Sequence, residues 1–139
     1  MTRISLTKNL FLDEYICKET YMKYIDHPWI LLGLIDERIV RADQMLRNYF
    51  GPVTINNWWD GNNRNWSGVR NPKSPDYSPE SQHTFGRASD KLFNATAEEV
   101  RTYIKANFIT LGITCIEANV TWVHSDVRNV QDRTKLLIV

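Results

Sequence analysis

The longest helical pattern in the chain runs from Ile30 to Phe50. Apolar residues recur there at steps of three and four positions, the spacing that lines one face of an α-helix. They are Leu31, Leu34, Ile35, Ile39, Met45, Leu46 and Tyr49. Gly51 and Pro52 follow directly and end the pattern. We therefore predict one long helix over 30–50, and the near-helical spacing of apolar residues predicts a shorter one over 5–19.

The second half of the chain predicts several strands and one further helix. Thr96 and Glu99 form a capping box, in which each side chain accepts from the other residue's backbone N–H, at the start of a helix over 97–108. Alternating apolar and polar residues and flanking turn residues indicate the strands. These are expected over 53–58, 88–93, 113–117, 121–128 and 135–139. The order predicts an α+β domain with helices packed on one face of a mostly antiparallel sheet.

A long loop separates the two halves. Positions 60–80 contain most of the turn-forming pairs of the chain: Asp60-Gly61, Asn71-Pro72, Ser74-Pro75 and Ser78-Pro79. Long ordered loops in small domains often carry binding or catalytic residues. This segment is therefore a candidate wall for a functional site.

Length and charge limit the classes of protein to consider. A chain of 139 residues fits a single domain, 1–139, with one sizeable core. The 17 Lys and Arg residues nearly balance the 16 Asp and Glu residues, so no nucleic acid or membrane partner is expected, because both require concentrated positive charge. No apolar run approaches the roughly 20 residues that span a bilayer. The N-terminal residues also lack the apolar stretch of a secretory signal peptide, so we expect synthesis without an export signal.

Two of the three histidines lie close to carboxylates in the sequence. His83 lies seven positions before Asp90, and His124 lies between Glu117 and Asp126. A catalytic zinc site needs three protein ligands and one open position for water. It also needs a further carboxylate that takes the proton of that water. Residues of each kind are present, although their spacing alone also fits hydrogen-bonded structural histidines.

Three segments resemble a known family of zinc enzymes. They are SGVR at 67–70, SQHTFGRASD at 81–90 and TWVHSDVR at 121–128. They resemble the zinc D-Ala-D-Ala carboxypeptidases and their bacteriophage relatives, which share a fold with the N-terminal domain of hedgehog proteins. Family members typically read S-G-Y/F-R, then S-x-H-x-x-G-x-A-x-D, then a strand ending in W/F-V-H. The opening LTKNLFLDEYICKE also resembles the start of short phage members, so the resemblance covers about residues 5–128 and implies the hedgehog/D-Ala-D-Ala peptidase-like fold.

The resemblance assigns roles to individual residues. It implies that His83, Asp90 and His124 bind Zn²⁺. It also implies that Arg70 faces the substrate and stabilises charge on the scissile carbonyl, which suits a permanently charged guanidinium with several donors. Ser81 matches a small hydroxyl residue near the metal that contacts the substrate or a metal ligand. The alternatives are a surface position for Arg70 and a turn-forming hydroxyl for Ser81.

The general base is where the chain departs from the family pattern. Many members carry Glu three residues before the last His, and Thr121 occupies that position here. A two-strand hairpin could bring Glu117 over the metal, and hedgehog-like relatives also place an acid several positions upstream. Asp126 shares a strand face with His124, so it is a second candidate base or a partner that orients the imidazole. We favour Glu117 as the base, with a zinc site that performs no chemistry as a further alternative.

The resemblance also implies a function. We expect a zinc peptidase that hydrolyses peptide bonds in the stem peptides of bacterial peptidoglycan, as a carboxypeptidase or an endopeptidase. A phage or prophage protein of this kind is made in the bacterial cytoplasm and acts on the cell wall after lysis, like an endolysin, or as a virion component. The alternative is a catalytically weak or inactive zinc-binding module that contacts other phage structural proteins. The missing upstream Glu favours that alternative.

Overall fold

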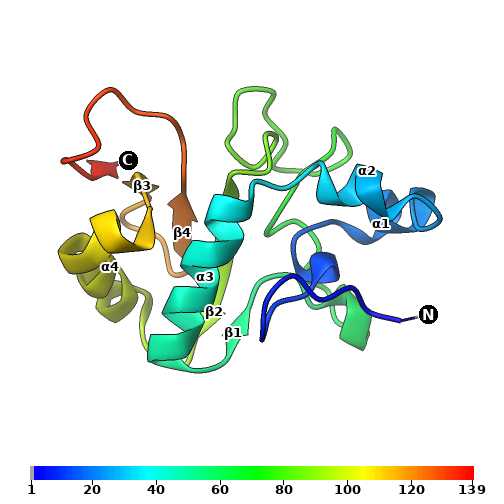
Figure 1. The fold of residues 1–139 in the computed structure, drawn as a ribbon, viewed down its shortest axis with the longest axis horizontal. Coiled ribbons are helices and arrows are strands. Elements are labelled where there is room, and N and C mark those ends of the chain that lie inside the picture. Colours follow the sequence, from blue (N-terminus) through cyan, green and yellow to red (C-terminus); the bar gives the residue numbers. More distant parts are fainter. Residues whose placement is uncertain (1) are drawn as a thin grey trace.

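A five-stranded sheet and the two long helices that cover it form the framework of the molecule (Figure 1). The computed structural model describes residues 2–139. In chain order the elements are the 3-10 helix η1 (Leu12–Glu14), α1 (Lys18–Lys23), α2 (Pro28–Leu32), α3 (Glu37–Phe50), β1 (Val53–Thr54), the 3-10 helix η2 (Trp58–Asp60), β2 (Ala88–Phe93), α4 (Ala97–Leu111), β3 (Cys115–Ile116), β4 (Val123–Asp126) and β5 (Leu137–Ile138). The α+β prediction is confirmed.

The sheet is mixed, with the strand order β1-β2-β4-β3-β5. The pairs β1–β2, β2–β4 and β4–β3 are antiparallel, and only the edge pair β3–β5 is parallel. In the β2–β4 ladder, Asp90 lies opposite His124 and Ser89 lies opposite Ser125. Because side chains alternate along a strand, the first pair and the second pair project from opposite faces of the sheet.

Helices α3 and α4 pack on the face that carries Ser89 and Ser125. In Figure 1, α3 lies in front of β2, with α4 beside it. Both helices and the sheet share a core whose buried residues are Ala42, Leu46, Val100, Ile104, Leu111, Ile113, Ile116 and Val123. The capping box of Thr96 and Glu99 starts α4 as predicted, and the helix continues to Leu111. The opposite face of the β2–β4 ladder is left for loops and for the candidate site.

The prediction of one helix over 30–50 is wrong at its N-terminal end. The segment forms the short helix α2 and then α3, which begins after Asp36. The Asp36 side chain caps α3 by accepting from the N–H of Arg38, and its own N–H donates to the carbonyl of Gly86. These bonds turn the chain between the two helices, and hydrophobic spacing alone does not reveal them.

The prediction of one helix over 5–19 is also wrong. Only η1 and the start of α1 are helical there, because the segment between them bonds to a distant loop. The carbonyl of Tyr15 accepts from the N–H of Val69 at 2.7 Å, and Ile16 forms an isolated bridge with Val69. The side chains of this segment are buried in a second core, with Leu10, Leu12, Tyr15, Ile16, Tyr21 and Trp58 among its members. Apolar residues thus mark burial here without marking a helix.

The long loop predicted over 60–80 is confirmed and extends to the start of β2. Between η2 and β2, the described residues contain neither helix nor multi-residue strand. Side chains and backbone fix it instead: the Ser67 N–H donates to Asn56 Oδ1 at 2.8 Å, and the Ser67 carbonyl accepts from the Asp90 N–H at 2.7 Å. None of the helices in residues 2–139 combines the length and the apolar character needed to cross a membrane.

Candidate metal centre

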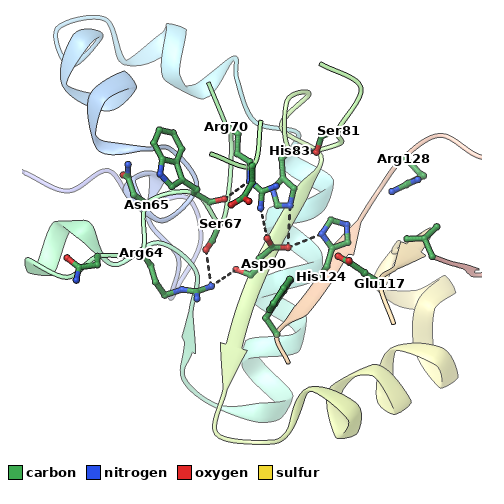
Figure 2. A pocket seen from close by; sticks show the side chains of 15 residues that line it. Arg64, Asn65, Ser67, Arg70, Ser81, His83, Asp90, Glu117, His124 and Arg128 are labelled. Atoms are coloured by element: carbon green, nitrogen blue, oxygen red, sulfur yellow. Dashed lines mark hydrogen bonds and ion pairs between the residues drawn. The ribbon is translucent and has the colours of Figure 1, made fainter. Parts of the chain in front are cut away.

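Three side chains of the ligand type converge on the open face of the sheet (Figure 2). His83 comes from the long loop, Asp90 from β2 and His124 from β4, and all three are buried. Asp90 Oδ1 lies 3.3 Å from His83 Nε2 and 2.9 Å from His124 Nδ1, and one ligand atom from each residue lies within 4.8 Å of the others. Ligands bound tetrahedrally to zinc at about 2.0–2.2 Å lie about 3.3–3.6 Å apart, so this cluster can hold a metal ion after small adjustments.

The far atom of each of these side chains is held by a second partner. His83 Nδ1 lies 2.8 Å from the carbonyl of Gly68, and His124 Nε2 lies 2.9 Å from Asp126 Oδ2. Both partners are acceptors, so in a neutral imidazole that binds a cation through its near nitrogen, the far nitrogen carries the proton and donates it. The near nitrogens are therefore the ones with the lone pair in the neutral imidazole, which is the form that binds a metal ion.

Asp90 is oriented in the same way. Its Oδ2 accepts from Arg70 Nη2 at 2.7 Å, which leaves Oδ1 directed at the two histidines. Two imidazole nitrogens and one carboxylate oxygen form the ligand set of many catalytic zinc sites. The donor chemistry and the outer partners thus both fit a divalent cation of this type.

The charges of the cluster favour binding of a cation. Burial by itself raises the pKa of Asp90, but hydrogen bonds from His124 and His83 lower that pKa below its usual value, so Asp90 stays ionised. Burial lowers the pKa of His124, and the contacts with Asp126 and Asp90 raise it to above its usual value. His124 lies between the carboxylates of Asp90 and Asp126, a position that favours positive charge.

Asp126 lies behind His124 and is fully buried. Its two oxygens accept from Arg128 Nε at 2.7 Å and Arg128 Nη2 at 2.6 Å, in addition to His124. Burial raises the pKa of Asp126, but Arg128 and then His124 lower it to about 2. Asp126 is therefore an anionic partner of the imidazole and does not line the cleft above it.

A cleft of about 610 Å³ opens above the three converging side chains. The other predicted site residues on its wall are Arg70, Ser81 and Glu117. Glu117 follows β3, and its N–H donates to the carbonyl of His124 at 3.3 Å, so the β3–β4 pairing brings it beside that histidine. Ser81 has a second role, because its Oγ accepts from the N–H of His83 at 3.2 Å and shapes the turn.

Sequence reasoning missed several residues that line or support the site. The Gly68 carbonyl holds His83, and a methyl group on Gly68 would collide with the carbonyl of Tyr15. Only glycine therefore allows this close approach. The SGVR motif includes this glycine, but the sequence alone does not show why it is needed. Arg128 was detectable, because it lies two residues after Asp126 and its side chain can reach the same carboxylate. Arg64, whose Nη2 donates to Ser67 Oγ at 2.9 Å, carries no signal in its local sequence.

Gly86 marks a second close approach of the backbone. Gly86 has a φ of 69°, and its backbone lies against the carbonyl of Leu34, in the turn before α3. The glycine therefore serves the junction between the loop and α3.

Comparisons of this chain with protein-family models, with curated proteins and with solved structures found no match.

Proposed function

We propose that this chain is a zinc-dependent peptidase that hydrolyses peptide bonds in the stem peptides of bacterial peptidoglycan. One observation carries the proposal. Three buried ligand atoms converge, their far atoms are held by Gly68, Arg70 and Asp126, and the group lies on the wall of an open cleft. The resemblance of the three sequence motifs supports zinc as the ion and peptidoglycan as the substrate.

The protein's residues divide the work of peptide hydrolysis among them. His83, Asp90 and His124 would hold the ion, which when bound supplies a Lewis acid that activates water and polarises a carbonyl. Glu117, beside His124 on the cleft wall, takes the proton from the attacking water and gives it to the departing amine. Arg70 lies on the same wall with its guanidinium fixed by Asp90 Oδ2 and by the carbonyl of Trp66. Its remaining donors stabilise negative charge on the scissile carbonyl oxygen.

The geometry favours Glu117 over Asp126 as the base. Asp126 is fully buried, and its oxygens accept from His124 and from Arg128. Glu117 is half-buried and lines the cleft. A base must reach the proton that it removes, and of these two carboxylates Glu117 is the one that borders the cleft in which water and substrate would lie. We assign Asp126 the role of orienting His124.

A second candidate function is a zinc-binding module with little or no catalysis, within a phage particle. Thr121, in the position where the family carries its base, is exposed and does not line the cleft. In either case the resemblance favours a phage or prophage protein made in the bacterial cytoplasm. As an enzyme it acts at the cell wall after lysis or from the virion, and as a module it contacts other phage structural proteins.

Zinc content and amine release separate these candidates. Wild type and Glu117→Gln would be loaded with zinc, and the release of new amino groups from purified sacculi would be measured. The peptidase proposal expects one zinc ion per chain in both, cleavage by the wild type, and a loss of at least about 100-fold in Glu117→Gln, the lower range for a general base. Glu37→Gln is the matched control, because the Glu37 side chain is 87% exposed on α3.

The other outcomes are equally informative. If wild type and Glu117→Gln both bind zinc and neither cleaves sacculi, the non-catalytic module is the correct reading. If the wild type holds no zinc, both candidate functions fail. If Glu117→Gln cleaves as fast as the wild type, the base is another residue.

A further inference from the structure

A buried ion pair lies behind the candidate metal centre, on the helix-covered face of the sheet. Lys91 and Asp43 are both 0% exposed, and Lys91 Nζ lies 2.8 Å from Asp43 Oδ1. Two charges removed from water pay a desolvation penalty that their attraction often does not repay, so a buried pair is weak evidence for stabilisation. The positions of the partners of this pair suggest another role.

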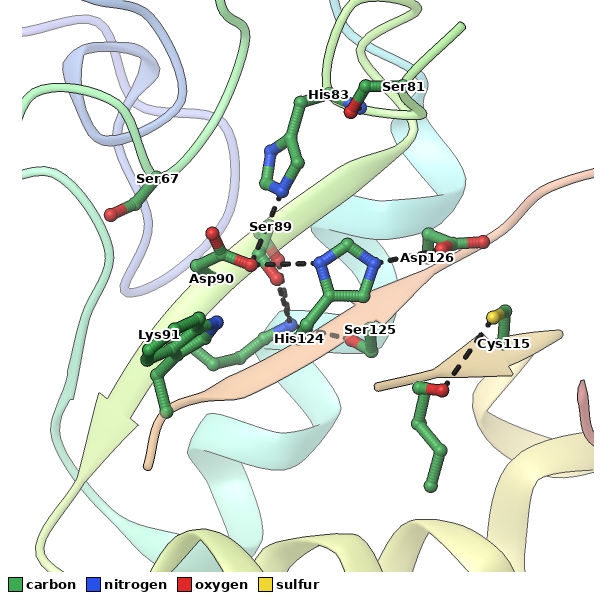
Figure 3. A network of polar contacts seen from close by, with 12 residues as sticks. Ser67, Ser81, His83, Ser89, Asp90, Lys91, Cys115, His124, Ser125 and Asp126 are labelled. Carbon is green, nitrogen blue, oxygen red and sulfur yellow. Dashed lines mark hydrogen bonds and ion pairs between the residues drawn. The ribbon is translucent and has the colours of Figure 1, made fainter. Parts of the chain in front are cut away.

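The first set of partners joins β2 to β4 beside the metal ligands. Lys91 Nζ donates to Ser89 Oγ at 2.7 Å and to Ser125 Oγ at 2.6 Å (Figure 3). Ser89 and Ser125 are directly opposite in the ladder, and the adjacent pair is Asp90 opposite His124. The ammonium group therefore adds a side-chain link between the two strands, one residue away from two of the three ligands.

The second set of partners leads to the third ligand. Asp43 Oδ2 accepts from Ser89 Oγ at 2.6 Å and from Tyr15 OH at 2.8 Å. The carbonyl of Tyr15 accepts from the N–H of Val69 at 2.7 Å, and the preceding residue, Gly68, holds His83 Nδ1. Asp43 on α3 thus ties the strand of Asp90 to the segment that orients His83.

We propose that Lys91 and Asp43 are positioning residues for the metal centre: the pair sets the spacing of the three ligands from the opposite face of the sheet. The inference rests on the proposed metal centre and is independent of peptidase activity. Hydrogen bonds from an ammonium group have defined lengths and directions, whereas apolar contacts tolerate small slides between strands. A metal ion requires its ligands within a few tenths of an ångström, so the directional network suits the task.

The test removes both charges and preserves the volume. Lys91→Met combined with Asp43→Asn leaves no unpaired charge, and the amide oxygen can still accept from Tyr15 and Ser89. Zinc affinity would be measured by competition with a chromophoric chelator, and the absorption spectrum of the Co²⁺-loaded protein would report ligand geometry. We expect zinc affinity to fall about tenfold, the low end of the effect of removing a partner next to a ligand, and the cobalt bands to change in intensity.

A core substitution provides the matched control. Ile104→Val removes one methylene from the core between α4 and the sheet, away from the network. It destabilises the fold by about 0.5–1.5 kcal/mol. The proposal expects it to keep wild-type zinc affinity and the wild-type cobalt spectrum. The zinc affinity of each variant is compared with its loss of folding stability. If Ile104→Val and the double variant both lose zinc affinity in proportion to the stability they lose, the pair only stabilises the fold and the proposal is overturned.

A milder variant keeps the proposal testable if the double variant does not fold. Ser125→Ala removes one acceptor of Lys91 and leaves the ion pair with Asp43 in place. We expect a smaller loss of zinc affinity in the same direction. An unchanged affinity and cobalt spectrum in Ser125→Ala, or in a folded double variant, overturns the proposal. A wild type that binds no zinc overturns the metal centre itself, which the wild-type titration reveals before any variant is compared.

Discussion

The two faces of the β2–β4 ladder carry polar clusters with opposite hydrogen-bonding patterns. On the helix face, the donors of Lys91 meet acceptors on Asp43, Ser89 and Ser125, so charge and hydrogen bonding are matched inside the protein. On the cleft face, Asp90 Oδ1 and the near nitrogens of two histidines are directed at one another.

The difference shows which of the two buried polar clusters has the geometry of a cation site. Once the far nitrogens of His83 and His124 donate to Gly68 and Asp126, the inward atoms of the neutral residues are all acceptors. Acceptors that converge in this way can bind a cation, whereas the helix-face cluster already contains the ammonium group of Lys91. Adjacent residues of one strand thus belong to different clusters, because their side chains project from opposite faces of the sheet.

Removal of a ligand on the cleft face should give the largest change. His83→Ala deletes one of three inward atoms and leaves the strands and helices untouched. We expect zinc affinity to fall by more than about 100-fold, beyond the range for the loss of an outer partner. Chelator competition measures the affinity, and circular dichroism checks that the fold persists. Retention of tight zinc binding by this variant would contradict the distinction between the two faces.

The single substitution on the helix face should affect stability instead. Lys91→Met leaves Asp43 buried without its cation, and breaking a buried pair in this way typically destabilises a protein by about 3–5 kcal/mol. Urea unfolding of the metal-free protein measures the loss. The double variant with Asp43→Asn should recover much of it, because no isolated charge remains. A Lys91→Met protein as stable as the wild type would show that the pair is dispensable.

Substitution of Asp126 tests whether zinc binding on the cleft face depends on the side chain that holds His124 from behind. Asp126→Asn keeps the shape but removes the charge that holds the imidazolium or metal-bound form of His124. We expect a loss of about 10–100-fold in zinc affinity, typical of a partner of a metal-bound histidine. If Asp126 were the base instead, the variant would keep its zinc affinity and lose only turnover. Measuring both quantities on the same preparation decides between these roles.

Substitution of Glu14 should give the smallest effect, and its carboxyl group belongs to neither polar cluster. It is partly buried and accepts from the N–H of Phe11, and burial raises its pKa to about 7. The folded state therefore holds this proton more tightly than the unfolded state. The stabilisation that Glu14 contributes is fully present below the unfolded pKa, near 4.5, and is lost as pH rises through 7.

Glu14→Gln should remove this pH dependence. The variant should be more stable than the wild type at pH 8 and similar to it at pH 4.5, which thermal unfolding across this range measures. An equal difference at both pH values would show that the Glu14 carboxyl titrates normally.

The sequence predicted the sheet and α4 better than the N-terminal half. Strand β2 and the start of α4 agree with prediction because local pattern and capping coincide there. The helix predicted over 5–19 does not form, since Tyr15 bonds through its carbonyl to Val69, more than fifty positions away. Local periodicity contains no information on such a contact.

Part of the candidate site could also be predicted from local sequence patterns. Asp90 and His124 were identified from motifs, and their opposition in the ladder places them on one face. The contacts of Arg70 with Asp90 and of Gly68 with His83 join residues that are far apart in sequence, so spacing could not reveal them. The helix-face network was missed because Lys91 and Asp43 each look like ordinary polar surface residues in the sequence.

Zinc K-edge X-ray absorption on the purified, zinc-loaded protein tests the central claim most directly. The account predicts one zinc ion per chain, with nitrogen and oxygen neighbours at about 2.0–2.2 Å and a histidine scattering pattern that weakens in His83→Ala, where only the imidazole of His124 remains. The absence of stoichiometric zinc would contradict the account. A sulfur neighbour at about 2.3 Å would also contradict it, because it would place the ion on Cys17 or Cys115 instead.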